Sequence, residues 1–528
     1  MKKFLLTIIL TFAGWTGFAQ SDTNIISGER SIGKNSLTQK DIVAREFVFP
    51  ERIYDTYIDT LHHCVTVQLR GMETDKKKRS WFHNSGTVML YDFSNNRIKW
   101  SKPINYVTGD ISQYDNVIVQ TDGEKSYCLN YETGNDLWEV KNAISYVEPD
   151  LHVGIGYKKT GAFRDTPSNT LEGIDLTTGS VLWKRELNRE YGWNGIFHST
   201  DSTLIIVAAG LHEVNINTGK GWDYTTVTGD EDYTASAAGA AVGTVAGVAL
   251  GVLTGMFVIP IGYGSDLVRD VASNVWADSL NFYFASRERL ACLGHDGEVK
   301  WMNFLPNDMT SKSYIFIKDG VLYMINRGFA YMGARKLGYG TPFIAKFNRK
   351  TGERFYLSKV GERKEQMNGF DIEEDTLFVL FKDRISKYSL YNGSLIAEQT
   401  FDVKTYGGLN GFVGSQVYIK TDSAYQNMLL SDTTRCYVTT GNGKILTLDD
   451  KLNVVGQTDF DQLYIHYLNY HGYRFIAKDD RTIVIDENGR EVTNMNISRK
   501  TDIIGSKLYN IQEKSIVEVD LADVLGTR

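Results

Sequence analysis

Asp175-Leu176-Thr177-Thr178-Gly179-Ser180-Val181-Leu182-Trp183 has the sequence of a tight β-hairpin. Leu176 to Gly179 suits a type I turn, and Gly179 can take the positive φ that closes such a hairpin with a bulge. The Asp175 carboxylate can accept hydrogen bonds from the turn amides, and Trp183 brings a large apolar side chain to the returning strand. The stretch therefore predicts a hairpin that carries its own packing residue.

The same pattern recurs along most of the chain. Clear copies hold Gly134 with Trp138, Gly219 with Trp222, Gly297 with Trp301, and Gly352 followed by Phe355 and Tyr356. An earlier copy at 91–100 has Asn in place of glycine, worn copies lie at 390–393, 449–452 and 486–489, and 515–521 resembles half a copy. Most copies are separated by about 40 residues, which is enough for four short strands and their turns.

Regular spacing without a helical pattern between the copies favours radial repetition of four-stranded sheets. A β-sandwich would not repeat one hairpin in this way, and a β-helix would need shorter rungs. The sequence predicts an all-β protein, a β-propeller of four-stranded blades over residues 53–528, with eight blades expected. Residues 20–52 carry no repeat and are predicted to be a polar lead-in segment.

The Asp-x-x-Thr-Gly-x-x-x-Trp repeat resembles that of the quinoprotein-like (PQQ-repeat) β-propeller superfamily. The resemblance covers residues 80–500 and is best at Gly134 with Trp138 and at Gly179 with Trp183. The superfamily includes pyrroloquinoline-quinone dehydrogenases and the outer-membrane-assembly propeller lipoprotein. It implies eight blades and tryptophans that dock between neighbouring blades. The repeat residues are structural, so the resemblance implies a fold more strongly than an activity.

The residues that a quinone dehydrogenase of this superfamily would use cannot be found here. The four cysteines, Cys64, Cys128, Cys292 and Cys436, are never adjacent, and no Glu/Asn/Asp set for calcium can be assigned. Cys128 and Cys292 fall at matching strand positions, which is typical of buried free thiols. His62-His63 before Cys64 lack partners at metal-ligand spacing and are interpreted as a strand end. We therefore expect a chain without catalytic, cofactor-binding or metal-binding residues, and not an enzyme.

The N-terminus and the composition indicate export and exclude some partners. Lys2 and Lys3 precede an apolar run, and Gly17-Phe18-Ala19 offers small residues for cleavage, so 1–19 is predicted to be a signal peptide. The formal net charge of -7 argues against nucleic acid as a partner. Lys76-Lys77-Lys78-Arg79, the strongest basic run, is interpreted as a solvated loop, with a phosphate or lipid-headgroup contact as the alternative. The expected location is the periplasm or outer-membrane periphery of a Gram-negative bacterium, or outside the cell.

One segment, 228–266, does not fit the repeat. It lengthens the gap between Gly219 and Gly297 to 78 residues, and Tyr233–Ser265 contains no charged residue. Its glycines are spaced by four like a glycine zipper, and with Phe257 they are the predicted partner or membrane contacts: Gly239, Gly243, Gly247, Gly251 and Gly255. Five glycines would cost an isolated helix about 5 kcal/mol relative to alanine, so the segment, if helical, needs lipid or protein around it. A ring on both sides of it excludes a single membrane crossing, which leaves a re-entrant hairpin, an oligomer contact, packing on the protein's own surface or a mobile loop.

Two functions from different classes remain. The first is a non-enzymatic scaffold of the cell envelope that binds other envelope proteins, with 233–265 contacting membrane or partner and homo-oligomers possible. The second is a quinoprotein-like enzyme or small-ligand binder that uses the central channel. Converging carboxylates and basic groups at the channel mouth would favour the second, and apolar side chains that plug it would favour the first. Residues 327–340 are a further outlier, interpreted as a long hairpin tip or, alternatively, a binding loop.

Overall fold

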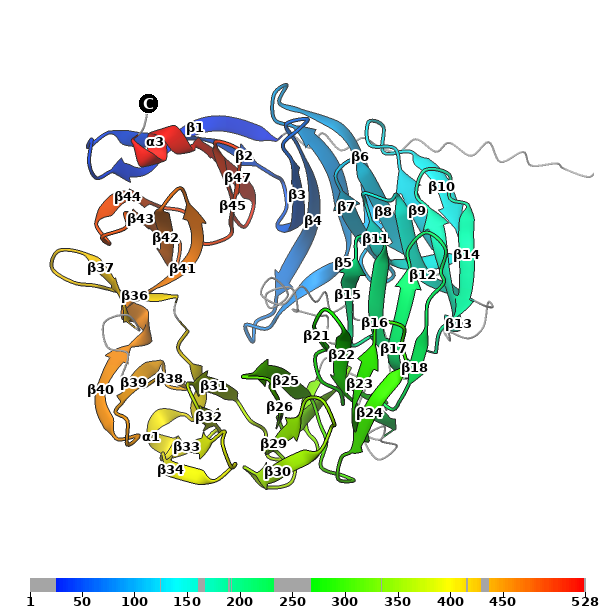
Figure 1. The fold of residues 1–528 in the computed structure, drawn as a ribbon. Coiled ribbons are helices and arrows are strands. Elements are labelled where there is room, and N and C mark those ends of the chain that lie inside the picture. The colour runs from blue at the N-terminus through cyan, green and yellow to red at the C-terminus, as the bar shows by residue number, and fades with distance from the viewer. Residues whose placement is uncertain are drawn as a thin grey trace, which may run out of the picture.

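The chain forms a β-propeller, in which antiparallel sheets follow one another around a ring (Figure 1). The computed structural model describes residues 25–526 except 124, 160–166, 189, 191, 232–266, 334, 415 and 429–435. Strands dominate this part of the chain. The short helices in it are α1 (Val403–Tyr406), α3 (Leu521–Leu525) and the 3-10 turn η1 (Phe460–Gln462).

Eight separate four-stranded sheets stand in ring order. The first four consist of β3 (Ile53–Asp59), β4 (Cys64–Thr74), β5 (Ser80–Asp92) and β6 (Arg97–Asn105); β7 (Gly109–Tyr114), β8 (Val117–Asp122), β9 (Lys125–Leu129) and β10 (Asp136–Val140); β11 (Asn142–Glu148), β12 (Val153–Lys159), β13 (Pro167–Asp175) and β14 (Val181–Glu186); β15 (Gly195–Thr200), β16 (Thr203–Ala208), β17 (Gly210–Asn215) and β18 (Asp223–Thr225). The next four consist of β21 (Trp276–Ala277), β22 (Asn281–Ala285), β23 (Arg289–Gly294) and β24 (Val299–Phe304); β25 (Ser313–Lys318), β26 (Val321–Asn326), β29 (Phe343–Asn348) and β30 (Arg354–Lys359); β31 (Gly369–Glu373), β32 (Thr376–Leu380), β33 (Arg384–Ser389) and β34 (Leu395–Thr400); β35 (Leu409–Phe412), β38 (Cys436–Thr440), β39 (Lys444–Leu448) and β40 (Val454–Asp459).

An eleven-stranded sheet completes the ring. One four-strand group in it is β41 (Leu463–Tyr470), β42 (Tyr473–Lys478), β43 (Arg481–Ile485) and β44 (Glu491–Met495); the other is β45 (Thr501–Ile504), β46 (Lys507–Ile511), β47 (Ser515–Asp520) and β2 (Asp41–Val48). β1 (Ile26–Asn35) joins the two groups, and the hairpin of β36 (Val417–Lys420) and β37 (Tyr425–Asn427) adds to β41. Eight separate sheets and these two groups make up the ring, so the expected count of eight blades is not confirmed.

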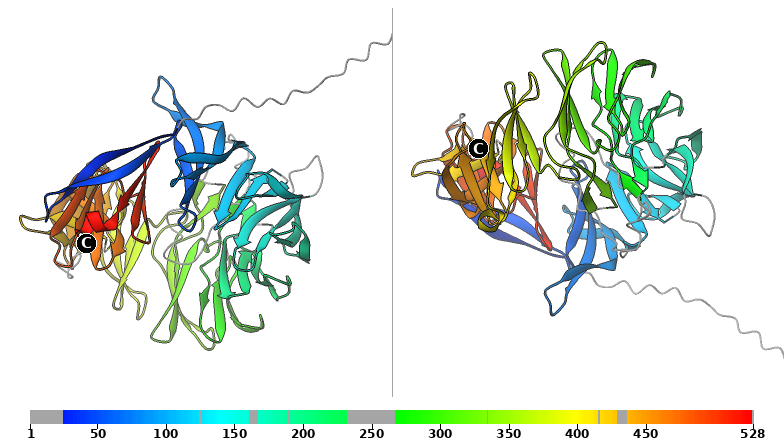
Figure 2. Two further views of the ribbon diagram at one scale, coloured as in Figure 1. Left: turned by 90° about the horizontal axis from the view of Figure 1, so that it is seen from above. Right: turned by 90° about the horizontal axis from the view of Figure 1, so that it is seen from below.

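The two ends of the chain close the ring together. β2 pairs with β47 from Arg45 opposite Glu518 to Val48 opposite Ser515, and β1 pairs with β44. Figure 2 shows the blue N-terminal strands beside the orange and red C-terminal ones. The segment expected as a polar lead-in is thus, from residue 26 to 48, part of the ring.

The hydrophobic core is divided into clusters that lie between neighbouring sheets. Leu90 of the first sheet shares a cluster with Ile118 of the second, and this arrangement continues around the ring. Phe47 and Tyr509 of the last group pack with Val65 of the first sheet, so the seam between the chain ends has a core of its own. Each sheet is therefore stabilised mainly by its two neighbours.

The repeat residues connect one sheet to the next. Trp183 is 7% exposed, and its Nε1 donates to the carbonyl of Ile216 in the following repeat turn at 2.7 Å. Gly219 has a φ of +70°, and its Cα faces the Trp183 ring so closely that a Cβ would collide with it. The same pairing of a tryptophan with the glycine of the next turn joins Trp100 to Gly134, Trp138 to Gly179, Trp222 to Gly297 and Trp301 to Gly352. Glycine is required at these positions for its left-handed backbone and for its missing side chain.

Within the turn, Asp175 acts as the sequence suggests. Its Oδ1 accepts hydrogen bonds from the amides of Thr177 at 2.7 Å and Thr178 at 3.1 Å, and Gly179 has a φ of +74°. The pKa of Asp175 is lowered because these hydrogen bonds outweigh the effect of burial, which raises it. Asp175 therefore orders the turn and is not available for chemistry.

Candidate functional site

The two faces of the ring are built differently. Because strands alternate in direction, the turns between second and third strands lie on the same face as the connections between sheets. We call this the insertion face. The opposite, repeat-turn face carries the Asp-x-x-Thr-Gly turns, such as 175–179 between β13 and β14. The repeat turns are short, and the β36–β37 hairpin emerges on their face, between β35 and β38. Three elaborations emerge on the insertion face, so this face is the candidate functional surface.

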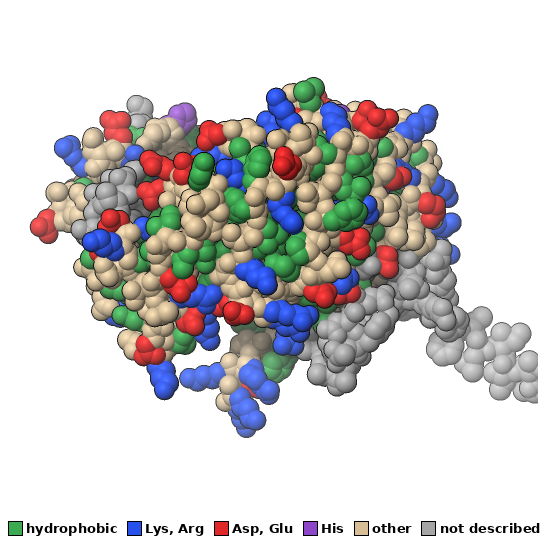
Figure 3. Space-filling view, turned by 60° about the horizontal axis from the view of Figure 1, so that its bottom comes forward, with side chains coloured by type: hydrophobic (Ala, Val, Ile, Leu, Met, Phe, Trp, Pro, Cys, Tyr) green, Lys and Arg blue, Asp and Glu red, His purple; other side chains and the backbone are tan. Residues whose placement is uncertain are grey.

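The first elaboration is a finger, residues 71–82, at the tip of the β4–β5 hairpin. Its base is fixed by Arg70, which is 6% exposed, donates to the carbonyl of His83 at 2.6 Å and lies 5.0 Å from the ring centroid of Tyr54. Its tip is the Lys76–Arg79 run, in which Asp75 accepts from the amides of Lys77 and Arg79 at 2.9 and 2.8 Å. Figure 3 shows a narrow projection with Lys and Arg side chains at its end. Trp81 lies in β5 next to the tip and is 48% exposed.

The other two elaborations meet in one small sheet. β19 (Asp230–Glu231) and β20 (Leu267–Arg269) flank residues 232–266, and β27 (Phe329–Met332) and β28 (Arg335–Gly338) form the hairpin between β26 and β29. β20 pairs with both β19 and β27, which gives a four-stranded sheet outside the repeat. The 327–340 outlier is thus a hairpin, and it anchors the flanks of the apolar insertion. The predicted contact residues Gly239, Gly243, Gly247, Gly251, Gly255 and Phe257 lie outside the described residues.

A cleft of about 1770 Å³ opens on the insertion face, next to the strands that close the ring. Basic side chains line it together with acidic ones: Arg30, Arg52, Lys444, Lys478, Arg499 and Lys500, with Asp55, Asp459, Asp461, Asp479, Asp480, Asp502 and Glu513. Some of these pair within the wall, as Arg52 does with Glu513 at 2.9 Å. Carboxylates and basic groups therefore converge in this cleft, the arrangement expected of a small-ligand binder.

Two carboxylates of the cleft have altered acidity. Both Asp55 and Asp502 reach solvent, but burial by the surrounding protein raises the pKa of each, and the amide of Thr56 only partly offsets this for Asp55. Neither forms an ion pair with a described residue. A ligand with a cationic or hydrogen-bond-donating group could therefore gain from contact with them.

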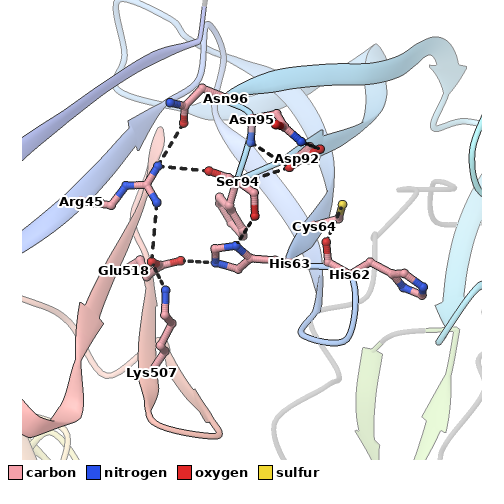
Figure 4. A network of polar contacts seen from close by, with 11 residues as sticks. Arg45, His62, His63, Cys64, Asp92, Ser94, Asn95, Asn96, Lys507 and Glu518 are labelled. Atoms are coloured by element: carbon pink, nitrogen blue, oxygen red, sulfur yellow. Dashed lines mark hydrogen bonds and ion pairs between the residues drawn. The ribbon is translucent and has the colours of Figure 1, made fainter.

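A second polar cluster, at the seam between the chain ends, proves to be structural (Figure 4). Ser94 Oγ lies 2.7 Å from His63 Nδ1, and His63 Nε2 lies 2.9 Å from Glu518, an order that resembles a nucleophile, base and acid. The amides of Ser94 and Asn95 both donate to Asp92, so they cannot stabilise an oxyanion. Glu518 also accepts from Lys507 at 2.6 Å and therefore links β46, β47 and the first sheet.

The remaining sequence candidates have structural surroundings. His62 bonds to Asp59 at 2.8 Å, and Tyr131 donates to the same carboxylate at 2.6 Å. In the described parts of the chain, no three His, Cys, Asp or Glu side chains come together as metal ligands would. None of the described helices is long and apolar enough to cross a membrane.

All four cysteines are free thiols in the structure, and Cys64, Cys128 and Cys292 are buried. Burial raises the pKa of Cys128 to about 11 and that of Cys436 to about 12. Because the thiolate is the reactive form, we expect the folded protein at pH 8 to react only slowly with a disulfide reagent such as Ellman's reagent. Four thiols should react promptly in guanidinium. Fast labelling of the native protein would contradict the buried positions.

Comparison with known proteins identifies no family. No protein-family model matches the chain, and no curated protein matches it. Solved structures with similar folds include BamB from Moraxella catarrhalis (13% identity, 73% of this chain and 96% of that one, TM-score 0.32) and apo AztD from Citrobacter koseri (10%, 71% and 93%, 0.29). Another is the dihydro-heme d1 dehydrogenase NirN (11%, 78% and 76%, 0.29). The fold assignment rests on the sheets and clusters described above.

Proposed function

We propose that the protein is a non-enzymatic β-propeller of the bacterial cell envelope that binds other proteins through its insertion face, with residues 233–265 contacting membrane or partner. The observation that carries the proposal is the difference between the two faces. Short repeat turns lie on one face, which also carries the β36–β37 hairpin, whereas the finger, the extra sheet and the cleft all belong to the other. Exposed loops on a rigid scaffold are the usual place for binding.

The base of the apolar insertion supports this proposal. Glu231 and Leu267 are paired neighbours, so the chain leaves and re-enters the ring at one place. Asp230 fixes the base because it accepts from Tyr339 at 2.7 Å and pairs with Arg287 at 2.9 Å. A segment held in this way returns to the side that it left. It can contact a bilayer or a partner from one side, but it cannot make a single crossing.

The test is to replace residues 232–266 with a short Gly-Ser linker. We expect the variant to keep its circular dichroism spectrum and melting temperature, because both flanks are already paired. It should lose co-sedimentation with phosphatidylethanolamine/phosphatidylglycerol vesicles, or its molar mass in light scattering should fall. A folded variant with unchanged sedimentation and mass would refute a role for the insertion in either contact.

A second candidate, a small-ligand binder, is favoured by the charged cleft. Its mixed charges and the raised pKa of Asp55 and Asp502 suit a polar ligand with a positive group. Calorimetry with cationic and zwitterionic amines, repeated on Asp55→Asn, separates this function from the first, because the linker variant above would leave it intact. Quinone absorbance or calcium-dependent dye reduction by the purified protein would overturn the non-enzymatic proposal.

A further inference from the structure

Two cationic side chains share one aromatic ring at the base of the β27–β28 hairpin. The guanidinium carbon of Arg327 lies 4.8 Å from the ring centroid of Phe329, and Lys336 Nζ lies 3.9 Å from the same centroid. Phe329 is 2% exposed, so the ring is a fixed part of the core. Phe370 of β31 lies 5.7 Å from Arg327 and adds a second ring. The two cations are therefore held near each other by rings that carry no charge.

Neither cation has an acidic partner among the described residues. The charge of Asp270 favours the charged form of Arg327, but its carboxylate is paired with Lys312, and Glu365 is paired with Arg384. Arg327 Nε is buried and makes no hydrogen bond. Its two terminal nitrogens have no hydrogen-bond partner among the described residues, and they are not fully buried. The charged end of the side chain can thus be reached by a ligand.

The electrostatic surroundings are unfavourable for both charges as they stand. Burial lowers the pKa of Arg327, which Tyr331 and the charge of Asp270 only partly offset, and burial together with the nearby Arg327 charge lowers that of Lys336. Cation–π contacts offset only part of the loss of solvation. Some part-buried arginines elsewhere have a carboxylate partner, as Arg185 has in Asp223 at 2.7 Å. An anion between protein and solvent would supply the missing counter-charge at Arg327 and Lys336.

We propose that Arg327 and Lys336 form a binding site for a small organic anion, one that carries a carboxylate or phosphate group and a flat apolar body. The guanidinium fork can hold two oxygens of such a group, and the ammonium can add a third contact. Tyr314 of the inner strand β25 is 37% exposed, and its ring centroid lies 5.4 Å from that of Phe370. These two rings offer an apolar surface next to the cations. The site shares no residue with the cleft or with the apolar insertion, so it goes beyond the proposed function.

The test uses phenyl phosphate as the probe in calorimetric titration of the full chain. Phenyl phosphate should bind, inorganic phosphate should bind more weakly, and neutral phenol should not bind detectably. Arg327→Met and Lys336→Met should each lower the affinity for phenyl phosphate at least tenfold, since each removes a charged contact. Arg335→Met removes an exposed cation next to Lys336 and should leave the affinity within twofold.

A second readout distinguishes binding from a purely structural role. Arg327→Met removes a charge without a counter-ion, so the melting temperature should be unchanged or higher. NMR of dimethylated lysines should show one lysine resonance that titrates with a lowered pKa and is absent from Lys336→Met. The pKa of this lysine should rise when phenyl phosphate is added. The proposal fails if the wild type binds no phenyl phosphate, if Arg335→Met weakens it as much as Arg327→Met, or if Arg327→Met unfolds the protein.

Discussion

Replacing Trp183 with alanine is expected to lower the free energy of unfolding by about 3–5 kcal/mol, the usual range for a buried aromatic side chain. The indole is 7% exposed, packs in the cluster between the third and fourth sheets and covers Gly219. Its loss removes apolar burial and also the hydrogen bond to the Ile216 carbonyl. The midpoint of guanidinium unfolding, followed by circular dichroism, measures the effect.

The neighbouring residue provides the control for this prediction. Leu182 is 46% exposed on the same strand. Leu182→Ala should therefore change the free energy of unfolding by less than about 0.5 kcal/mol. If the two variants unfold at the same midpoint, the tryptophan is not the packing residue that joins the sheets. Gly219→Val should resemble Trp183→Ala, because the new side chain would displace the same ring.

Glu518→Gln is expected to cost about 3 kcal/mol, because it removes the charge that joins the two chain ends. The carboxylate is 5% exposed and accepts from both Lys507 and His63. Gln keeps the shape of the side chain but removes the negative charge that Lys507 and His63 contact. Glu513→Gln is the matched control, since Glu513 is 64% exposed and its ion pair with Arg52 should contribute no more than about 1 kcal/mol.

The same residue should make the ring sensitive to acid. Burial raises the pKa of Glu518, but the hydrogen bonds from Lys507 and His63 outweigh it, and the pKa lies below the ordinary value. A carboxyl group with a lowered folded-state pKa stabilises the protein above the unfolded-state pKa of about 4.3, and this contribution is lost as the pH falls through the folded-state value. The stability difference between wild type and Glu518→Gln should therefore shrink below pH 4.5. A difference that is constant from pH 7 to pH 3 would contradict this assignment.

The parts of the fold that could be predicted are those encoded in short stretches. The turn from Asp175 to Gly179 depends on its own residues. Trp183 predicts a neighbouring sheet, because a tryptophan on a strand needs a surface to pack against. The propeller followed from the recurrence of this unit. The family resemblance implied that the tryptophans dock between neighbouring blades, and the structure places them there, each against the glycine of the next turn.

What could not be predicted depends on contacts between distant parts of the chain. β2 closes the ring through strand pairing and through contacts such as that of Glu46 with Ser515, and nothing in the polar sequence of 26–48 indicates such a partner. The outliers at 230–269 and 327–340 were recognised separately, but their union through β20 and β27 is a tertiary feature. Arg327 and Lys336 were visible only as part of a mixed loop, since the absence of a counter-charge can be judged only in three dimensions.

The pairing of β2 with β47 has a consequence for the order of events during synthesis. β2 is made near the start of the chain and has to wait for β47, the last strand, so the final sheet cannot be completed on a nascent chain. Until then, β2 presents an open edge that can recruit another chain. A population of stalled or C-terminally truncated chains should therefore be prone to aggregation, while full-length chains remain monodisperse once the two ends have met.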